Sequence, residues 1–152
     1  MNVASATVAI RPALAADLEA MAAIHASSFA KGWSANEIGQ FLAAPGCLSL
    51  IASTAPEQAA RGFLIVRSAG DEAEILTLAV DRNHRRRGLA RALLSAAIDA
   101  LREAGAKRLF LEVEAGNESA RGLYQSLGAV AAGRRPGYYE HGADADIFSL
   151  AL

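Results

Sequence analysis

Short runs of apolar residues, either alternating with polar ones or continuous, predict strands along the whole chain. The runs are bounded by turn residues and lie at residues 6–12, 47–53, 61–68, 73–80, 107–113, around Val130, and at 146–152. Turn residues between the second, third and fourth runs favour three consecutive antiparallel strands. The run at 107–113 is too apolar for an exposed edge and predicts a central strand.

Apolar residues three or four positions apart predict four helices between these strands. They span residues 14–29, 34–45, 88–104 and 118–127. The second helix has the clearest signals, because Ser34 and Glu37 form a capping box and Trp33 and Ile38 occupy the staple positions. The order β-α-α-β-β-β-α-β-α-β-β predicts an α/β (α+β) fold in which a mixed sheet has helices on its faces.

Composition narrows the classes of function. The chain has 152 residues, of which 53% are hydrophobic, and a net charge of -1, so we expect one folded domain spanning residues 1–152 and no general affinity for nucleic acid. A single cysteine, Cys47, and three scattered histidines, His25, His84 and His141, argue against a disulfide or a metal site. No apolar run reaches the roughly 20 residues that span a bilayer, and the first residues lack the pattern of a signal peptide. We therefore expect a cytoplasmic protein that does not bind membranes.

A basic segment, "AVDRNHRRRGLARALL" at residues 79–94, leads from a predicted strand into a predicted helix. Backbone N–H groups at the start of a helix attract anions, and a diphosphate would fit there. Gly88 lets the backbone approach a ligand, and the small Ala90 leaves it uncovered. A solvated basic loop is the alternative, and neither a Walker loop nor a dinucleotide fingerprint is present.

Glu112 lies within the apolar run "LFLEV", where an unpaired carboxylate would be costly. Such a group suits a general base. The alternatives are a residue on a solvated face of the strand or an ion-pair partner for Arg108. Tyr124 lies in the last predicted helix, where a tyrosine is usually a packing residue with a hydrogen-bonded hydroxyl.

Two segments together resemble the GNAT superfamily of N-acetyltransferases. "RRRGLA" at residues 85–90 is similar to its R/Q-x-x-G-x-G/A acyl-CoA pyrophosphate loop, and it follows a strand as that family requires. "LEVEAGNESARGLYQSLGA" at 111–129 resembles the L-E-V-x-x-x-N-x-x-A-x-x-L-Y-x-x-L-G-F segment of the ribosomal-protein-alanine N-acetyltransferases. The chain departs from that branch at Glu114, Gly116 and Ala129, which affects the substrate more than the fold.

The resemblance implies the GNAT fold, a mixed and mostly antiparallel central sheet of about seven strands flanked by about four helices. It implies acetyl-CoA as co-substrate, with Glu112 taking the amine proton and Tyr124 protonating the thiolate that leaves. Asn117 would both cap a helix and touch acetyl-CoA. The remaining residues expected to bind acetyl-CoA are Leu78, Ala79, Val80, Arg85, Arg86, Arg87, Gly88, Leu89, Ala90 and Arg91.

The acceptor is less clearly indicated. Tyr138 and Tyr139, between the last two predicted strands, could line a peptide groove or simply pack on the sheet. In the resembling branch this loop and the first two helices hold a protein N-terminus, often one that begins with alanine. We therefore expect an acetyl-CoA-dependent N-acetyltransferase that acts on the α-amine of a ribosomal protein. The alternatives are a small amine as acceptor (a polyamine, amino acid or antibiotic), an acyl-CoA sensor without turnover, or a basic-loop nucleic-acid binder.

Overall fold

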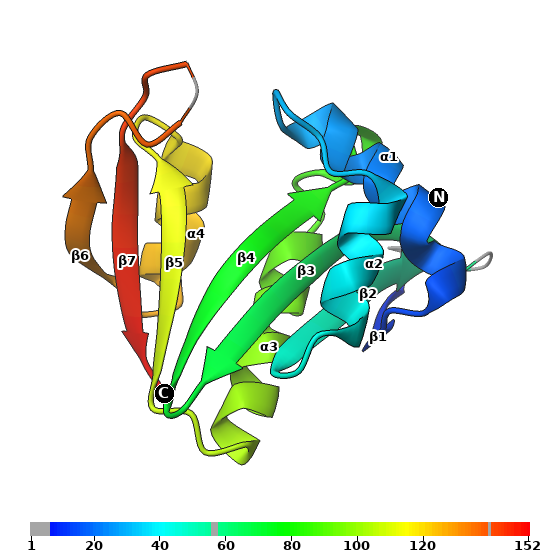
Figure 1. Ribbon diagram of the computed structural model, residues 1–152, viewed down its shortest axis with the longest axis horizontal. Helices are drawn as coiled ribbons and strands as arrows, with labels where there is room; N and C mark the ends of the chain where they lie inside the picture. The colour runs from blue at the N-terminus through cyan, green and yellow to red at the C-terminus, as the bar shows by residue number, and fades with distance from the viewer. Residues whose placement is uncertain (1–6, 56–57, 140) are drawn as a thin grey trace, which may run out of the picture. The chain divides into compact units, whose positions relative to one another are not determined.

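The computed structural model describes residues 7–55, 58–139 and 141–152. In these residues one sheet of seven strands has the order β1-β2-β3-β4-β5-β7-β6 (Figure 1). Its strands are β1 (Val8–Pro12), β2 (Cys47–Thr54), β3 (Ala59–Ala69), β4 (Glu72–Val80), β5 (Arg108–Glu114), β6 (Val130–Arg135) and β7 (Ala145–Ala151). Ala6, the first residue of the first predicted strand, lies outside the described residues.

The helices are α1 (Leu18–Ser28), α2 (Ala35–Ala43), α3 (Leu89–Glu103) and α4 (Glu118–Ser126), with short 3₁₀ turns η1 (Ala15–Asp17) and η2 (Arg82–His84). Strand pairs β1–β2, β2–β3, β5–β7 and β6–β7 are antiparallel, whereas β4 and β5 are parallel. These findings confirm the predicted mixed, mostly antiparallel sheet with four helices. They also confirm that the apolar run at 107–113 forms an interior strand.

The chain forms two compact units. The first contains residues up to 67 together with 76–99, and the second contains 68–75 together with 100–152. That residues 1–152 make a single domain stays a prediction.

In the first unit, α1 and α2 lie on one face of β2 and β3, and the beginning of α3 lies on the other face (Figure 1). The core beneath α1 and α2 takes apolar side chains from both helices and from β2, β3 and β4. It consists of Met21, Ile24, Ile38, Ile51, Phe63, Ile65 and Ala79. Met21, Ile38, Ile51 and Phe63 are completely buried, so this cluster supplies much of the hydrophobic stabilisation of the unit.

Local signals explain where the first two helices begin. The predicted capping box is present before α2, because the Glu37 N–H donates to Ser34 Oγ at 3.1 Å and the Ser34 N–H donates to Glu37 Oε1 at 3.2 Å. The first predicted helix begins instead with the 3₁₀ turn η1. There the Asp17 carboxylate accepts from the Leu14 N–H at 2.8 Å and from both terminal nitrogens of Arg11, and these bonds to Arg11 lower the pKa of Asp17.

In the second unit, α4 packs on β5 and β7 (Figure 1). Strand β5 pairs with β7 along its whole length, from Arg108 opposite Ala151 to Glu114 opposite Ala145. The first residues of β4, Glu72–Glu74, pair with the first residues of β5. Buried side chains on the α4 face of this sheet include Leu111, Val113, Tyr124, Phe148 and Leu150.

Candidate active site

The segment between β4 and α3 starts with η2, a turn that the sequence pattern did not predict. The Asp81 carboxylate accepts from the Asn83 N–H at 3.4 Å and lies 3.0 Å from Nδ1 of His84. The Asp81 N–H donates to the Arg61 carbonyl on β3 at 2.7 Å. An aspartate that bonds the backbone two residues ahead is a common way to begin a turn. Asp81 therefore fixes how the basic segment leaves the sheet.

Gly88 forms the junction between this segment and α3. Its φ is +82°, in the left-handed region that favours glycine, and a Cβ built there would meet no atom within 4 Å. The first N–H groups of α3 have no acceptor inside the helix. Arg86 and Arg87 next to Gly88 are exposed, and Arg86 also has a positive φ of +63°. The junction therefore offers an open backbone, cationic side chains and a helix start, which together suit a diphosphate.

Two of the predicted ligand residues use their side chains within the protein. Arg85 donates from Nε to the Val80 carbonyl at 3.2 Å and from Nη2 to Ser28 Oγ at 3.2 Å, which links the segment to the end of α1. The Leu89 side chain is buried in the core, with 2% of its surface exposed. Any contact from Leu89 to a ligand must therefore come from its backbone.

The residues before this segment, Leu78–Val80, form the end of β4. Ala79 belongs to the buried core of the first unit, and Leu78 and Val80 are half-buried. Val80 Cγ2 lies 3.2 Å from the position that a Cβ on Gly62 would take, so a larger residue on the neighbouring strand would press against Val80. The structure thus brings residues 78–80 and the loop of residues 85–91 together in the first unit.

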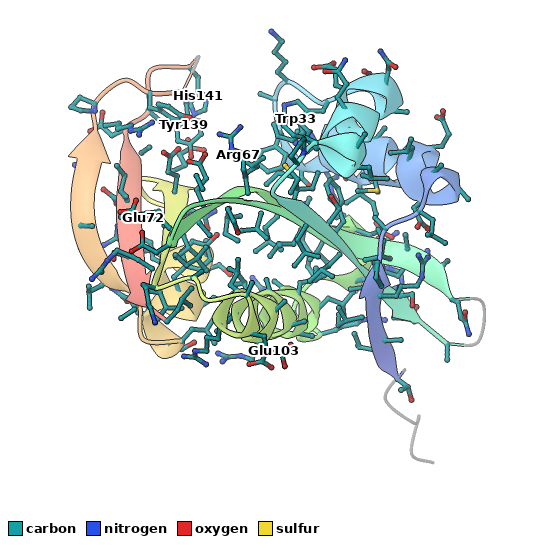
Figure 2. The ribbon with its side chains drawn as sticks, turned by 60° about the horizontal axis from the view of Figure 1, so that its bottom comes forward. Trp33, Arg67, Glu72, Glu103, Tyr139 and His141 are labelled. Carbon is teal, nitrogen blue, oxygen red and sulfur yellow. The ribbon has the colours of Figure 1, made fainter. Side chains whose placement is uncertain are left out.

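An aromatic cluster lies between α1 and α2, the other region that the resemblance linked to the acceptor. The His25 ring stacks on Trp33, with ring centroids 4.6 Å apart, and its Nδ1 accepts from the Trp33 N–H at 3.0 Å. Burial lowers the pKa of His25. Phe29 also contacts the His25 ring and is 41% exposed. Figure 2 labels Trp33 in this region.

Glu112 lies on β5 between the buried Leu111 and Val113, so its side chain points to the face opposite α4. Its carboxylate pairs with Arg135 Nη1 at 3.2 Å, and its side chain is 27% exposed. Arg108, the partner suggested by the sequence, instead donates to Ser149 Oγ. Glu112 is therefore a half-buried carboxylate with one cationic partner from β6, not an unpaired one.

Tyr124 lies on α4 and is 6% exposed. Its ring meets Phe148 of β7 edge to face, with centroids 6.1 Å apart. Burial, with a smaller contribution from Tyr139, raises the pKa of Tyr124 to about 12. Tyr124 and Glu112 thus approach opposite faces of the same part of the sheet.

The connection between β6 and β7 places two tyrosines beside these groups, although Glu140 within it lies outside the described residues. Tyr138 is 49% exposed, packs against the Arg135 guanidinium, and has its pKa raised chiefly by the negative charge of Glu112. Burial and the charge of Glu112 raise the pKa of Tyr139 to about 12. Tyr139 therefore interacts electrostatically with both Glu112 and Tyr124.

A further contact joins the connection between β6 and β7 to β5, through His141 and Glu114. His141 stacks on Tyr139, with ring centroids 5.8 Å apart (Figure 2). Its Nε2 lies 2.6 Å from Glu114 Oε1. The sequence marked Glu114 only as a departure from the resembling branch and indicated no role for His141. No local signal could have paired them, because they are 27 residues apart in the chain.

Asn117 caps α4, as predicted, because its Oδ1 accepts from the Ala120 N–H at 3.2 Å. Its contact with acetyl-CoA stays a prediction.

In the second unit, the structure brings Glu112, Tyr138 and Tyr139 together on one face of the sheet, and Tyr124 lies on the other face.

Comparison with known proteins decides the family. A family model described as "Acetyltransferase (GNAT) family" matches residues 18–129, which is more than two thirds of the chain. This protein belongs to the GNAT family. The match includes both the basic loop of the first unit and the Glu112 and Tyr124 positions of the second.

Curated GNAT relatives include the [ribosomal protein bS18]-alanine N-acetyltransferase of Escherichia coli K12, which is 42% identical over 93 residues. That match covers 59% of this chain and 63% of the relative, so the chain spans less than two thirds of its length. A putative enzyme of the same name from Bacillus subtilis is 30% identical over 95% of both chains. The crystal structure of the ribosomal-protein-S18-alanine N-acetyltransferase from Escherichia coli has a TM-score of 0.87 and 33% identity, and the match covers 96% of this chain and 94% of that one.

Two further findings concern the described part of the chain. No helix there is long and apolar enough to cross a membrane. Among the same residues, no group of three or more His, Cys, Asp or Glu side chains could hold a metal ion.

Proposed function

We propose that this GNAT protein transfers the acetyl group of acetyl-CoA directly to an amine, and that its acceptor is the N-terminal α-amine of a ribosomal protein. The observation that carries the proposal is that a half-buried carboxylate, Glu112, and a buried phenol, Tyr124, lie at the same part of one sheet, on opposite faces. A direct transfer needs one group that removes a proton and one that donates a proton. Similarity to the Escherichia coli enzyme that modifies bS18 supports the choice of acceptor.

Acetyl-CoA supplies an activated thioester carbonyl. The loop around Gly88 would hold its diphosphate, since the backbone there is open and Arg86 and Arg87 are exposed. The end of β4, Leu78–Val80, would pair with its pantetheine arm.

Glu112 would accept the proton of the attacking amine, directly or through water. The C–N bond then forms as the C–S bond breaks, and the thiolate receives a hydrogen bond or proton from Tyr124. The pKa of Tyr124, about 12, lies well above the value of about 8.5 that is usual for a thiol. Tyr124 therefore acts mainly by hydrogen-bonding the thiolate as its charge develops, and solvent completes the proton transfer. A tyrosine with the usual pKa of about 10 would make this transfer uphill by only a modest amount, and burial increases the difference.

An α-amine suits this site better than a lysine. The usual pKa of an α-amine is about 7.7–8.0, against about 10.4 for lysine, so more of it is neutral near pH 7. Tyr138, which is half-exposed and interacts electrostatically with Glu112, offers apolar surface for an extended peptide. A small amine remains the second candidate for the acceptor.

The test is an acceptor panel. Wild-type protein and Glu112→Gln are incubated with acetyl-CoA and with N-terminal peptides of ribosomal proteins, lysine peptides or small amines, and release of free thiol is measured. We expect turnover with an alanine N-terminus and a loss of roughly 10²-fold or more in Glu112→Gln, with a smaller loss at high pH where the amine is already neutral. Turnover with small amines alone would refute the acceptor, and binding of acetyl-CoA without turnover on any amine would identify a sensor.

A further inference from the structure

One buried carboxylate ties three elements of the second unit together. Asp146 on β7 is 7% exposed and lies between Val113 of β5 and Arg134 of β6. Its Oδ1 accepts from Arg134 Nε at 2.8 Å, and its Oδ2 accepts from Arg121 Nη1 of α4. A buried charge is stable only when it is paired in this way. The two guanidinium groups therefore fix α4 and β6 to the same point on β7.

Arg121 also touches the aromatic pair that contains Tyr124. Its guanidinium lies over the Phe148 ring, 5.4 Å from the centroid, and that ring is completely buried against Tyr124. Arg121 and Tyr124 are three residues apart on α4, so they lie on the same side of the helix. Asp146 and Phe148 are two residues apart on β7 and lie on the same face of the strand.

These contacts form one continuous chain from Asp146 through Arg121 and Phe148 to Tyr124. We propose that Arg121, held by Asp146, is a positioning residue that fixes the ring of Tyr124 for the acetyl transfer. The inference rests on the proposed function, in which Tyr124 donates to the departing thiolate. A donor that shifts by about 1 Å loses much of its effect on rate, of the order of 10²-fold.

The contacts of the Arg121 side chain indicate that Arg121 positions Tyr124 and does not bind substrate. Arg121 points toward β7, and its partners are Asp146, Phe148 and, at 4.0 Å, the exposed Glu118. We therefore expect Arg121→Ala to lower kcat by about 10-fold to 10²-fold while KM for acetyl-CoA stays unchanged. Arg121→Lys keeps the charge but loses the planar fork, so its kcat should be intermediate. Arg102→Ala is the matched control, because Arg102 is an exposed arginine near the end of α3.

A double-mutant cycle tests whether Arg121 acts through Tyr124. In a Tyr124→Phe background, Arg121→Ala should cause no further loss of kcat, since the donor that it positions is already gone. Losses that multiply in the double variant would overturn the inference, as would an unchanged kcat in folded Arg121→Ala. Asp146 keeps Arg134 as a partner in this variant, so we expect it to fold, which circular dichroism checks. If it does not fold, Arg121→Lys is used in the same cycle.

A readout that does not depend on turnover distinguishes this inference from the proposed function. The NMR resonances of the Tyr124 ring, assigned by their loss in Tyr124→Phe, should shift in Arg121→Ala and Arg121→Lys but stay in place in Arg102→Ala. Unmoved Tyr124 resonances would overturn the positioning role even if the enzyme is active. Absence of turnover in the wild-type protein, with shifted resonances, would refute the proposed function and leave the structural coupling established.

Discussion

Removing the hydroxyl of Tyr124 is the most informative perturbation of this site. Tyr124→Phe keeps the ring that packs edge to face on Phe148, 6.1 Å away, so the fold should be retained. With a pKa of about 12 for Tyr124 and about 8.5 for a thiol, complete proton transfer is uphill by about 3.5 pKa units, or about 5 kcal/mol. Tyr124 can instead stabilise the developing thiolate with a hydrogen bond, which contributes about 1.5–3 kcal/mol and does not require the proton to be transferred.

That contribution sets the expected effect. A loss of about 1.5–3 kcal/mol from the transition state lowers kcat by about 10-fold to 10²-fold. Affinity for acetyl-CoA should survive, because the hydroxyl acts only as the C–S bond breaks. Raising the pH should not restore the rate, which separates Tyr124→Phe from Glu112→Gln.

The assay is single-turnover release of free thiol, with acetyl-CoA and with an acetyl thioester of a more acidic thiol. A better leaving group needs less help, so the ratio of wild-type to variant rates should be smaller for the second thioester. Equal ratios for the two thioesters, or a full rate in Tyr124→Phe where chemistry limits turnover, would refute the reasoning. The hydroxyl would then be structural, and the thiolate would leave without it.

Three further outcomes follow from other residues. Gly88→Asp should abolish acetyl-CoA binding, as measured by calorimetry. Gly88→Asn should retain more affinity, because asparagine has a similar size and also tolerates a positive φ but carries no charge. Equal losses of affinity in the two variants would show that the charge is not the cause. Ile38→Ala should lower the free energy of unfolding by about 2–5 kcal/mol in urea titrations, since Ile38 is completely buried, and a change below 1 kcal/mol would contradict that packing. The raised pKa of Tyr124 should also cost the folded protein about 3 kcal/mol of stability between pH 10 and 12, because unfolded tyrosine ionises near pH 10 and Tyr124 only near 12. Tyr139 adds to the total loss, and the part due to Tyr124 should disappear in Tyr124→Phe.

Features that depend on near neighbours could be predicted from the sequence. Ser34 and Glu37 cap α2, and Asn117 caps α4, each three residues from the group it binds. The apolar periodicity predicted strands and helices that form a mixed sheet with helices on its faces, and Gly88 marked the start of α3. These signals can be read from the chain because hydrogen bonds and side-chain contacts between residues one helical turn apart depend only on local backbone geometry.

Only the tertiary structure decided which charges meet. Glu112 pairs with Arg135, not with Arg108 four residues away, because on a strand the residue at i+4 is far along the sheet while the register of β5, β7 and β6 brings Arg135 near. The same register pairs Asp146 with Arg134, and the packing of α4 adds Arg121. The raised pKa of Tyr124 likewise comes mainly from the burial of its ring, and the extent of that burial cannot be predicted from the neighbouring residues in the sequence. Local sequence therefore determined the strands and the four α-helices, whereas strand register and helix packing, which depend on the whole chain, decided which charged and aromatic side chains meet.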